Sequence, residues 1–509
     1  MDERGVNDLA HRAWDGLPPG DLPRYRQLRT DIFLEAIAAG RPNKEAVRFQ
    51  GRSITYGELD AMTNRFANGL LALGARPGDV VGVMVENSLD VFALVYGVSR
   101  AGLSVLPMNP KYKPEEVAFQ VADAGAKLVV APGYLDSADV LAKGHERPPD
   151  TAVDENAFFH VRFSSGTTGT PKCIATTHRS IALMHQLFAR EFGYGEPDVN
   201  LITAPIAHAA FHFAAATIVA GGTVVIERGF DPKTIWETID RNQVTHTFMV
   251  PTMIALAMDS PGAGTSFKAL LSTASTFPSS IKSRFKERFP WVGIYDSYGF
   301  TEGSLATLLR PTDPPEKSAS VGLPAFGYAI RVLDFEGNRL PAGEIGEIYV
   351  RGPAMSYGYV GSVEMNPGQA RDGFVSAGDL GWLDEDGDRY VAARRDDLLG
   401  AGGRNRRRCS SVPCRMITGA PMSVPTLNGG PSAPAAASSS CTTFVAASSS
   451  PRPPRPRGQL GNCKPSSASS DHQVRTGRSG SQWRAIHALA SPRTSFPPVT
   501  RSTLPNAVG

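Results

Sequence analysis

A short run of hydroxyl and glycine residues, SSGTTGTPK at 164–172, has the residue types most suited to chemistry. Its hydroxyl groups can donate hydrogen bonds, its glycines let backbone N–H groups approach an anion closely, and its final lysine adds positive charge. The run follows a β-rich segment and precedes a helix pattern. These properties predict a binding loop for a polyphosphate, formed by Ser164, Ser165, Gly166, Thr167, Thr168, Gly169, Thr170 and Lys172.

The spacing within this loop separates it from the commonest phosphate loop. A Walker A loop has the pattern GxxxxGK[ST], whereas here Pro171 precedes Lys172 and Cys173 follows it. The spacing therefore argues against a P-loop ATPase or kinase. Taken alone, the run has a less favoured alternative, a flexible Ser/Thr/Gly surface loop, and the rest of the chain decides between the two.

The segments around the loop predict an α/β fold. Apolar runs with strand composition alternate with helical periodicity, which is typical of parallel sheets covered by helices. We expect a large N-terminal domain of parallel-rich sheets, a surface loop at 134–153, and a small β subdomain beyond 320, where DFEGN and DEDGD have hairpin-turn composition. The expected strands include 80–85, 103–109, 127–132, 157–165, 223–227 and 245–250, and the expected helices 61–75, 92–102, 114–126, 179–192, 232–243 and 279–289.

Charge divides the 509-residue chain into two parts. Residues 1–405 contain 39 basic and 48 acidic residues, a net charge of −9, whereas residues 406–509 contain 13 basic residues and one acidic residue, a net charge of +12. The basic part is rich in Ser, Pro and Ala, has no usable periodicity and is expected to be disordered. Its arginines lack interleaved aromatic residues, so we expect no nucleic-acid partner.

Cysteine use and hydropathy favour a cytoplasmic protein without an integral membrane segment. Four of the five cysteines lie beyond residue 405 without metal-ligand spacing, which disfavours zinc and a disulfide framework. The N-terminus is polar and acidic and has no signal-peptide pattern. The longest apolar region, 201–226, is interrupted by His208, His212 and a glycine pair, and it predicts a buried helix followed by a strand.

Several phrases in a fixed order extend the evidence from the loop to residues 30–405. These are ITYGELD (54–60), AGLSVLPMNPKYKPEEVAF (101–119), SSGTTGTPK (164–172), APIAHAAFH (204–212), YGFTEG (298–303), SAGDLGWLDEDG (376–387) and RRDDLLGAGGRN (394–405). Together they resemble the AMP-forming acyl-CoA synthetases, which belong to the adenylate-forming enzymes. The resemblance implies that ATP and a carboxylic acid give acyl-AMP and pyrophosphate, and that coenzyme A then displaces AMP.

The resemblance also implies roles for individual residues. Residues 164–172 would hold the β- and γ-phosphates, Tyr298 would lie against adenine, and Thr301 would bond the α-phosphate. Glu302 would hold Mg²⁺, a hard cation that prefers carboxylate oxygen. Asp379 would accept hydrogen bonds from the ribose hydroxyls, with Arg394 beside it. For Tyr298 alone, an ordinary core aromatic is an equal alternative.

The acid pocket is expected around the phrase PIAH at 205–208. His208 would lie at its mouth, although a core histidine is the alternative, and His212 is favoured as structural. No acidic residue occurs between Asp198 and Glu227 to pair with a substrate ammonium, which disfavours amino acids. Phe211, Phe213 and the many alanines nearby favour a fatty acid of medium to long chain or an aryl acid.

Two departures from the family pattern lie near the nucleotide. Cys173 stands where the family usually has glycine after the loop lysine. Thr273-Ala274-Ser275-Thr276 stands where the family often has Gly-Gly-Ala-Pro at the adenine, and we expect these bulkier residues to crowd the adenine or lower affinity for the nucleotide.

The C-terminal part is a third and larger departure. We expect residues 1–395 to form the large AMP-binding domain, 396–405 to contain the hinge at Asp396 and the start of a small domain, and 406–509 to be the low-complexity tail. The family's small domain supplies a lysine in a Gly-Lys phrase, but Lys464, the only lysine beyond 405, lacks that context. A frameshift near codon 405 would explain the abrupt change.

Two function classes therefore remain. One is an AMP-forming acyl-CoA ligase, and the other is a catalytically impaired remnant that binds nucleotide and acid but lacks the small-domain lysine. The sequence predicts no oligomeric state.

Overall fold

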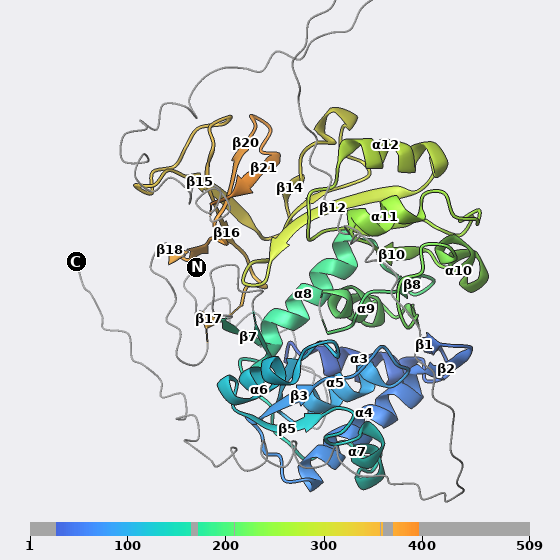
Figure 1. The fold of residues 1–509 in the computed structure, drawn as a ribbon. Coiled ribbons are helices and arrows are strands. Elements are labelled where there is room, and N and C mark those ends of the chain that lie inside the picture. The colour runs from blue at the N-terminus through green and yellow to red at the C-terminus, as the bar shows by residue number, and fades with distance from the viewer. Residues whose placement is uncertain (1–26, 164–171, 208, 357, 360–369, 396–509) are drawn as a thin grey trace, which may run out of the picture. The chain divides into compact units, whose positions relative to one another are not determined.

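The structure is a computed structural model that describes residues 27–163, 172–207, 209–356, 358–359 and 370–395. The predicted tail at 406–509 and the predicted hinge segment at 396–405 lie outside the described residues. The described residues form three sheets and the helices around them (Figure 1).

The largest sheet, sheet A, is mainly parallel. Its strand order is β14-β13-β12-β11-β10-β8-β9-β1-β2, and every neighbouring pair from β12 through β1 is parallel. Antiparallel neighbours β2, β13 and β14 close its two edges. The strands are β1 (Glu45–Phe49), β2 (Arg52–Thr55), β8 (Val199–Ile202), β9 (Thr223–Ile226), β10 (His246–Phe248), β11 (Ala269–Ser272), β12 (Gly293–Phe300), β13 (Ser304–Leu309) and β14 (Leu323–Pro324).

Sheet B is also parallel at its centre. Its order is β17-β7-β6-β4-β3-β5, with β5, β3, β4 and β6 parallel and β7 and β17 antiparallel to their neighbours. The strands are β3 (Val80–Val83), β4 (Ser104–Pro107), β5 (Ala126–Val130), β6 (Phe158–Phe163), β7 (Cys173–Thr177) and β17 (Gly358–Tyr359).

Sheet C is the small antiparallel sheet that was expected beyond residue 320. Its order is β18-β19-β16-β20-β21, with β15 beside β16. The DEDGD turn joins β20 to β21, and Asp384 Oδ1 stabilises it by accepting hydrogen bonds from the backbone N–H groups of Asp386 and Asp388. The strands are β15 (Ala329–Leu333), β16 (Gly346–Arg351), β18 (Ala370–Arg371), β19 (Phe374–Val375), β20 (Asp379–Leu383) and β21 (Arg389–Arg394).

Helices cover sheets A and B, and two of them lie between the sheets. Helix α8 (His178–Glu191) packs on α9 (Ala210–Val219); α8 contacts β6 and β7 of sheet B, and α9 contacts β8 and β9 of sheet A (Figure 1). Apolar residues of α10, α11 and α12 form a separate core with sheet A. The other helices are α3 (Thr30–Gly40), α4 (Tyr56–Ala72), α5 (Val91–Arg100), α6 (Pro114–Asp123), α7 (Ser137–Lys143), α10 (Ile235–Asn242), α11 (Pro251–Ala257) and α12 (Ser279–Arg288), with a 3₁₀ turn at Pro315–Lys317.

Local sequence explains where these helices begin. At α4, the Thr55 hydroxyl accepts from the Glu58 N–H, and the Glu58 carboxylate accepts from the Thr55 N–H, which forms a capping box.

The prediction of a surface loop at 134–153 is wrong in part, because α7 occupies residues 137–143. The Asp136 carboxylate caps that helix by accepting from the Ala138 N–H, and Val140 is buried on its inner face.

The predicted fold class is confirmed for the described residues: parallel-rich sheets covered by helices carry a small β subdomain. Because β8, β10, β11 and β12 run parallel, their carboxyl ends meet at one edge of sheet A. The phrases TAPIAH, STAST and YGFTEG directly follow or end β8, β11 and β12. Clefts at this edge are the usual ligand sites of α/β sheets.

Candidate active site

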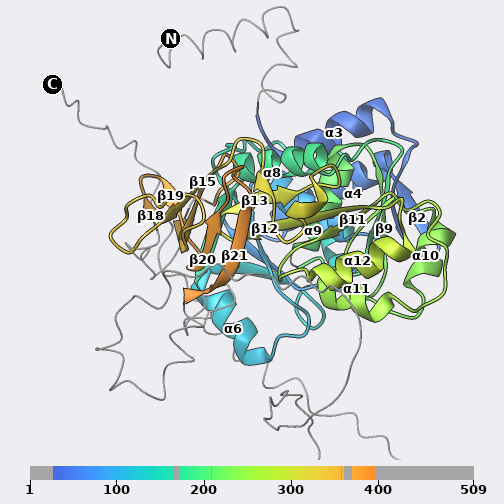
Figure 2. The same cartoon turned by 90° about the horizontal axis from the view of Figure 1, so that it is seen from above.

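Three of the predicted nucleotide residues come together from two sheets. Tyr298 lies on β12, and its hydroxyl donates a hydrogen bond of 2.5 Å to Asp379 Oδ2 at the start of β20. Asp379 is the register partner of Arg394 at the end of β21, and Arg394 Nε lies 3.9 Å from Asp379 Oδ1. Figure 2 shows β20 and β21 beside β12. The aromatic ring of Tyr298, the carboxylate of Asp379 and the guanidinium of Arg394 therefore form one cluster.

Burial affects the protonation of Tyr298 in this cluster. It raises the pKa of Tyr298 above its ordinary value, and the Asp379 carboxylate adds to the shift. The phenol therefore stays protonated and keeps donating to Asp379.

Sequence reasoning missed a fourth member, Arg389. Its guanidinium carbon lies 3.2 Å from the centre of the Tyr298 ring, and its side chain is fully buried. None of its side-chain nitrogens has a hydrogen-bond partner among the described residues. Burial lowers its pKa, and Tyr298, followed by the Asp379 carboxylate, partly opposes that shift. Arg389 is the one buried residue of β21, and its sequence RYVAAR carries no pattern that predicts a buried charge there.

The second predicted group surrounds Glu302. Its Oε1 accepts a hydrogen bond of 2.7 Å from the Tyr359 hydroxyl on β17, and Lys172 Nζ lies 5.1 Å from the centre of the Tyr359 ring. The Ser356 N–H donates to the carbonyl of Glu302, and the Ser356 hydroxyl donates to that of Thr301. Sequence reasoning missed Tyr359 and Ser356, because both contacts span more than fifty residues.

Backbone geometry also fixes the turn that carries Thr301 and Glu302. An added Cβ at Gly299 would lie 2.0 Å from the Ser304 carbonyl oxygen, so only glycine fits there. Glu302 offers one carboxylate, and no group of three or more acidic, His or Cys residues within the described residues could hold a metal. Mg²⁺ commonly takes one or two carboxylates together with substrate phosphates, so this residue set fits that ion.

Several predicted residues lie outside the described residues. They are the loop residues 164–171, His208 and the hinge residue Asp396. Lys172 at the end of the loop is described, as are Thr301, Glu302, Tyr298, Asp379 and Arg394.

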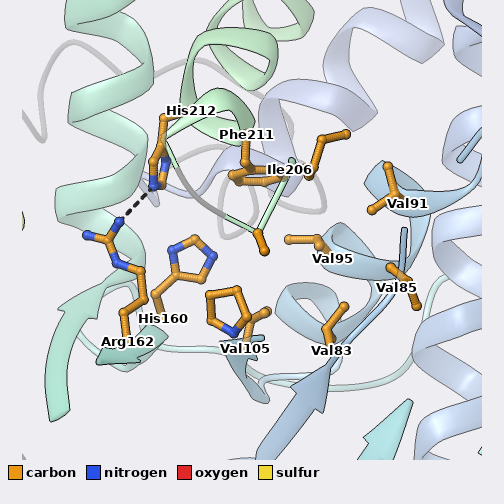
Figure 3. A pocket seen from close by; sticks show the side chains of 12 residues that line it. Val83, Val85, Val91, Val95, Val105, His160, Arg162, Ile206, Phe211 and His212 are labelled. Atoms are coloured by element: carbon orange, nitrogen blue, oxygen red, sulfur yellow. Dashed lines mark hydrogen bonds between the residues drawn. The ribbon is translucent and has the colours of Figure 1, made fainter. Parts of the chain in front are cut away.

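A pocket between sheet B and helices α5 and α9 opens beside the described part of PIAH (Figure 3). One end is polar and holds Arg162, His160 and His212, and the other is formed by valines. His212, favoured as structural from the sequence, thus lines the pocket. The remaining lining residues are Val83, Val85, Val91, Val95, Val105, Pro107, Ile206, Ala207 and Phe211.

The structure describes the surroundings of two departures from the family pattern, Cys173 and the segment 273–276. Cys173 is buried in β7, and burial raises the pKa of its thiol to about 12, so it is unreactive at neutral pH. Ala274 is exposed and has a φ of 74°, a left-handed conformation that favours glycine. The Thr273 hydroxyl donates to the Ser297 carbonyl and ties this segment to β12.

Comparison with known proteins identifies the family of the chain. Residues 34–360 match the family described as AMP-binding enzyme. The chain is 31% identical to a feruloyl-CoA synthase of Amycolatopsis sp over 385 residues, 72% of this chain and 78% of that protein. It is 28% identical to a 2-succinylbenzoate–CoA ligase of Bacillus subtilis (strain 168), over the same shares of the two chains.

Solved structures show the same fold. An o-succinylbenzoate coenzyme A synthetase of Bacillus subtilis in complex with AMP matches with a TM-score of 0.66 and 26% identity, covering 72% of this chain and 79% of that one. The N-terminal domain of FACL13 from Mycobacterium tuberculosis has a TM-score of 0.67 at 23% identity, and 99% of it is covered. The chain therefore belongs to the AMP-binding enzyme family and is, by family, an acyl-CoA synthetase.

Proposed function

We propose that this chain activates a fatty or aryl carboxylic acid with ATP, giving acyl-AMP and pyrophosphate, and then transfers the acyl group to coenzyme A. The observation that carries the proposal is the hydrogen bond between Tyr298 and Asp379, residues 81 positions apart. It joins the predicted adenine residue to the predicted ribose residue, and relatives named as CoA ligases support the same chemistry.

In this proposal the residues around Tyr298 hold the nucleoside. The ring of Tyr298 offers an apolar face to adenine, and the two oxygens of Asp379 suit the two ribose hydroxyls. The Tyr298 hydroxyl keeps Asp379 oriented, and Arg394 balances its charge. Residues 164–172 and Thr301 would bind the phosphates.

Glu302 would hold Mg²⁺ on the side where phosphate charge develops. Bound Mg²⁺ supplies electrostatic stabilisation to the phosphate oxygens. The Tyr359 hydroxyl bonds one oxygen of Glu302, which leaves the other oxygen to act as a ligand. Tyr359 thereby orients the carboxylate without neutralising it, and Ser356 holds the backbone carbonyls of Thr301 and Glu302.

The valine-lined end of the pocket supports an apolar acid. No acidic side chain lines this pocket, so a substrate ammonium would lack a partner there. Relatives include a feruloyl-CoA synthase and a fatty acid–[acyl-carrier-protein] ligase of Streptomyces coeruleorubidus. We therefore keep aryl and medium- to long-chain fatty acids as the substrate classes.

The second candidate function is a catalytically impaired protein that binds both substrates. It is favoured by the sequence at 406–509, which we propose to be a low-complexity tail after a large domain at 1–395 and a hinge segment at 396–405. Loss of a lysine contact to developing charge would cost about 3–4 kcal/mol, as loss of an oxyanion donor does.

Two assays with the full chain separate these candidates. Pyrophosphate release in the presence of ATP, Mg²⁺ and a panel of acids measures activation, and thioester formation with coenzyme A measures transfer. Robust thioester formation would refute the impaired candidate. Turnover with only acetate or amino acids would refute the proposed acid class.

The nucleotide sequence across codons 395–415 tests the origin of the tail. A frameshift predicts that another reading frame encodes a hydrophobically patterned domain ending in a Gly-Lys phrase. The absence of such a domain from both other frames would refute the frameshift.

A further inference from the structure

The polar end of the pocket is held by a line of three hydrogen bonds between residues of four elements. Arg162 Nη1 lies 3.2 Å from His212 Nε2, His212 Nδ1 lies 3.1 Å from His185 Nε2, and His185 Nδ1 lies 2.9 Å from Thr30 Oγ1. These residues come from β6, α9, α8 and α3, respectively. Figure 3 shows Arg162 and His212 facing each other at one side of the pocket.

The chemistry of these groups gives the line a single direction. A guanidinium can only donate, so His212 Nε2 must accept and its proton must lie on Nδ1. His212 then donates to His185 Nε2, and His185 donates from Nδ1 to Thr30. Burial lowers the pKa of His185 to about 3 and that of His212 well below 6.5, so both rings are neutral.

Arg162 is therefore the charged group at this end of the pocket. Burial lowers its pKa to about 10, which leaves it charged at neutral pH. Its Nε is buried and has no hydrogen-bond partner among the described residues. The carboxylate that acts on it electrostatically, Glu302, already accepts from Tyr359. A buried cation in this state gains stability from an anion in the pocket.

We infer that Arg162, held by the His212–His185–Thr30 line, binds the carboxylate of the acid substrate and orients its apolar body toward the valines. This inference rests on the proposed function and names the substrate class of its acid site. A guanidinium binds a carboxylate through parallel N–H donors, which fixes the direction of the bound acid. The influence of Glu302 on Arg162 places this end of the pocket toward the predicted phosphate and Mg²⁺ groups.

The other end of the pocket limits which acids fit. The cavity has a volume of only about 20 Å³ in this structure, so its side chains must move apart to admit the body of an acid. Val83, Val85, Val91, Val95 and Val105 line it, and no cation among the lining residues could pair with a second anionic group. A second buried carboxylate there would lack a partner. The pocket therefore selects a monocarboxylate with an apolar body, in contrast to the dicarboxylate named for the 2-succinylbenzoate–CoA ligases among the relatives.

Direct binding tests this inference separately from catalysis. Ferulate and dodecanoate, each with its neutral primary amide, are titrated into the full chain without ATP by calorimetry. For whichever acid binds more tightly, Arg162→Met should raise the Kd about 10- to 100-fold, the range for loss of a charge-assisted hydrogen bond. The amide should bind equally to both proteins, and Arg162→Lys should recover part of the affinity.

The matched control is Arg179→Met. Arg179 is exposed on α8 and bonds Glu155, so the variant removes the same charge outside the pocket. It should leave the Kd of the acid unchanged. Melting temperatures of all variants report whether each one is folded.

The inference is overturned if neither acid binds the wild-type chain, if Arg162→Met binds the acid as tightly as wild type, or if the variant weakens acid and amide equally. Tight binding of 2-succinylbenzoate would overturn the selection against a second anion. Acid binding through Arg162 without ATP-dependent pyrophosphate release would uphold the inference and refute the proposed function, so the two failures are distinguishable.

Discussion

Replacing Arg389 with methionine should stabilise the protein. The guanidinium is fully buried, stacks 3.2 Å from the centre of the Tyr298 ring, and has no hydrogen-bond partner for its nitrogens within the described residues. Methionine has a similar length and reach, and it fills irregular space without a charge. The backbone bonds of residue 389 to Val321 and Gly322 do not depend on its side chain.

The magnitude follows from two opposing contributions. Removing a guanidinium from water costs several kcal/mol, even after relaxation of the protein. Stacking on an aromatic ring returns about 2 kcal/mol when the pair is desolvated. The difference predicts that Arg389→Met raises the free energy of unfolding by about 1–3 kcal/mol, which lies within the range for replacing buried ions by apolar side chains.

The assay is urea unfolding of the ligand-free chain, followed by tryptophan fluorescence. Arg331→Met is the matched control, because Arg331 also stacks on a ring, 4.1 Å from the centre of Phe374, but its side chain is 40% exposed. This arginine incurs little desolvation cost. The control should therefore lose about 0.5–1 kcal/mol, the value of an exposed cation–π contact.

The reasoning would be refuted if Arg389→Met lowered the free energy of unfolding by more than the Arg331 control. Such a result would mean that the buried guanidinium is compensated by groups beyond Tyr298 and Asp379. A bound anion would be the first group to seek, by comparing unfolding with and without ATP.

Three further changes test other parts of the site and core. Glu302→Gln removes the carboxylate proposed to hold Mg²⁺, and it should slow pyrophosphate release about 100- to 1000-fold; a loss below about fivefold would contradict that role. Ala274→Gly removes the strain of a left-handed alanine, which costs about 1–2 kcal/mol of folding free energy. Glycine has a larger entropy loss on folding, which costs about 0.5–1 kcal/mol. The urea midpoint should therefore rise, and a lower midpoint would contradict the strain. Burial holds the pKa of His178 near 4 and that of His185 near 3 in the folded chain, below the unfolded value of 6.5. The unfolded chain thus binds more protons below pH 6.5, and stability should fall from pH 6 to pH 5 by about 1 kcal/mol for each histidine. His178→Gln should reduce that fall, whereas replacement of the exposed His145 should not; equal pH slopes in all three proteins would refute this explanation.

Local patterns predicted most of the large domain because its elements have strong periodicity. Fully buried strands such as β3 appear as continuous apolar runs, and amphipathic helices such as α8 repeat their apolar residues every three to four positions. Helix α7 was missed because it lacks such periodicity. It has seven residues and buries only Val140, so it carries almost no periodicity.

The site was predictable where a phrase carries the chemistry and unpredictable where a contact is made at long range. YGFTEG and SAGDLGW identified Tyr298 and Asp379, which the fold places in hydrogen-bond contact. Tyr359 was not identifiable, because only the pairing of β17 with β7 brings it to Glu302. Arg162 was hidden within a strand pattern, because the three residues that fix it, His185, His212 and Thr30, lie 23, 50 and 132 residues away in sequence.

The two proposed substrate sites predict that binding and turnover can be separated in this chain. Both proposed substrate sites are built within residues 27–395: the nucleoside residues join sheets A and C, and the acid pocket lies between sheet B and helices α5 and α9. The lysine that the family places in its small domain acts on developing charge, so its loss would slow activation and leave ATP and acid affinity intact. Wild-type affinities with slow pyrophosphate release would therefore point to residues 406–509, whereas weak binding of either substrate would point to Arg389, Ala274 or Arg162.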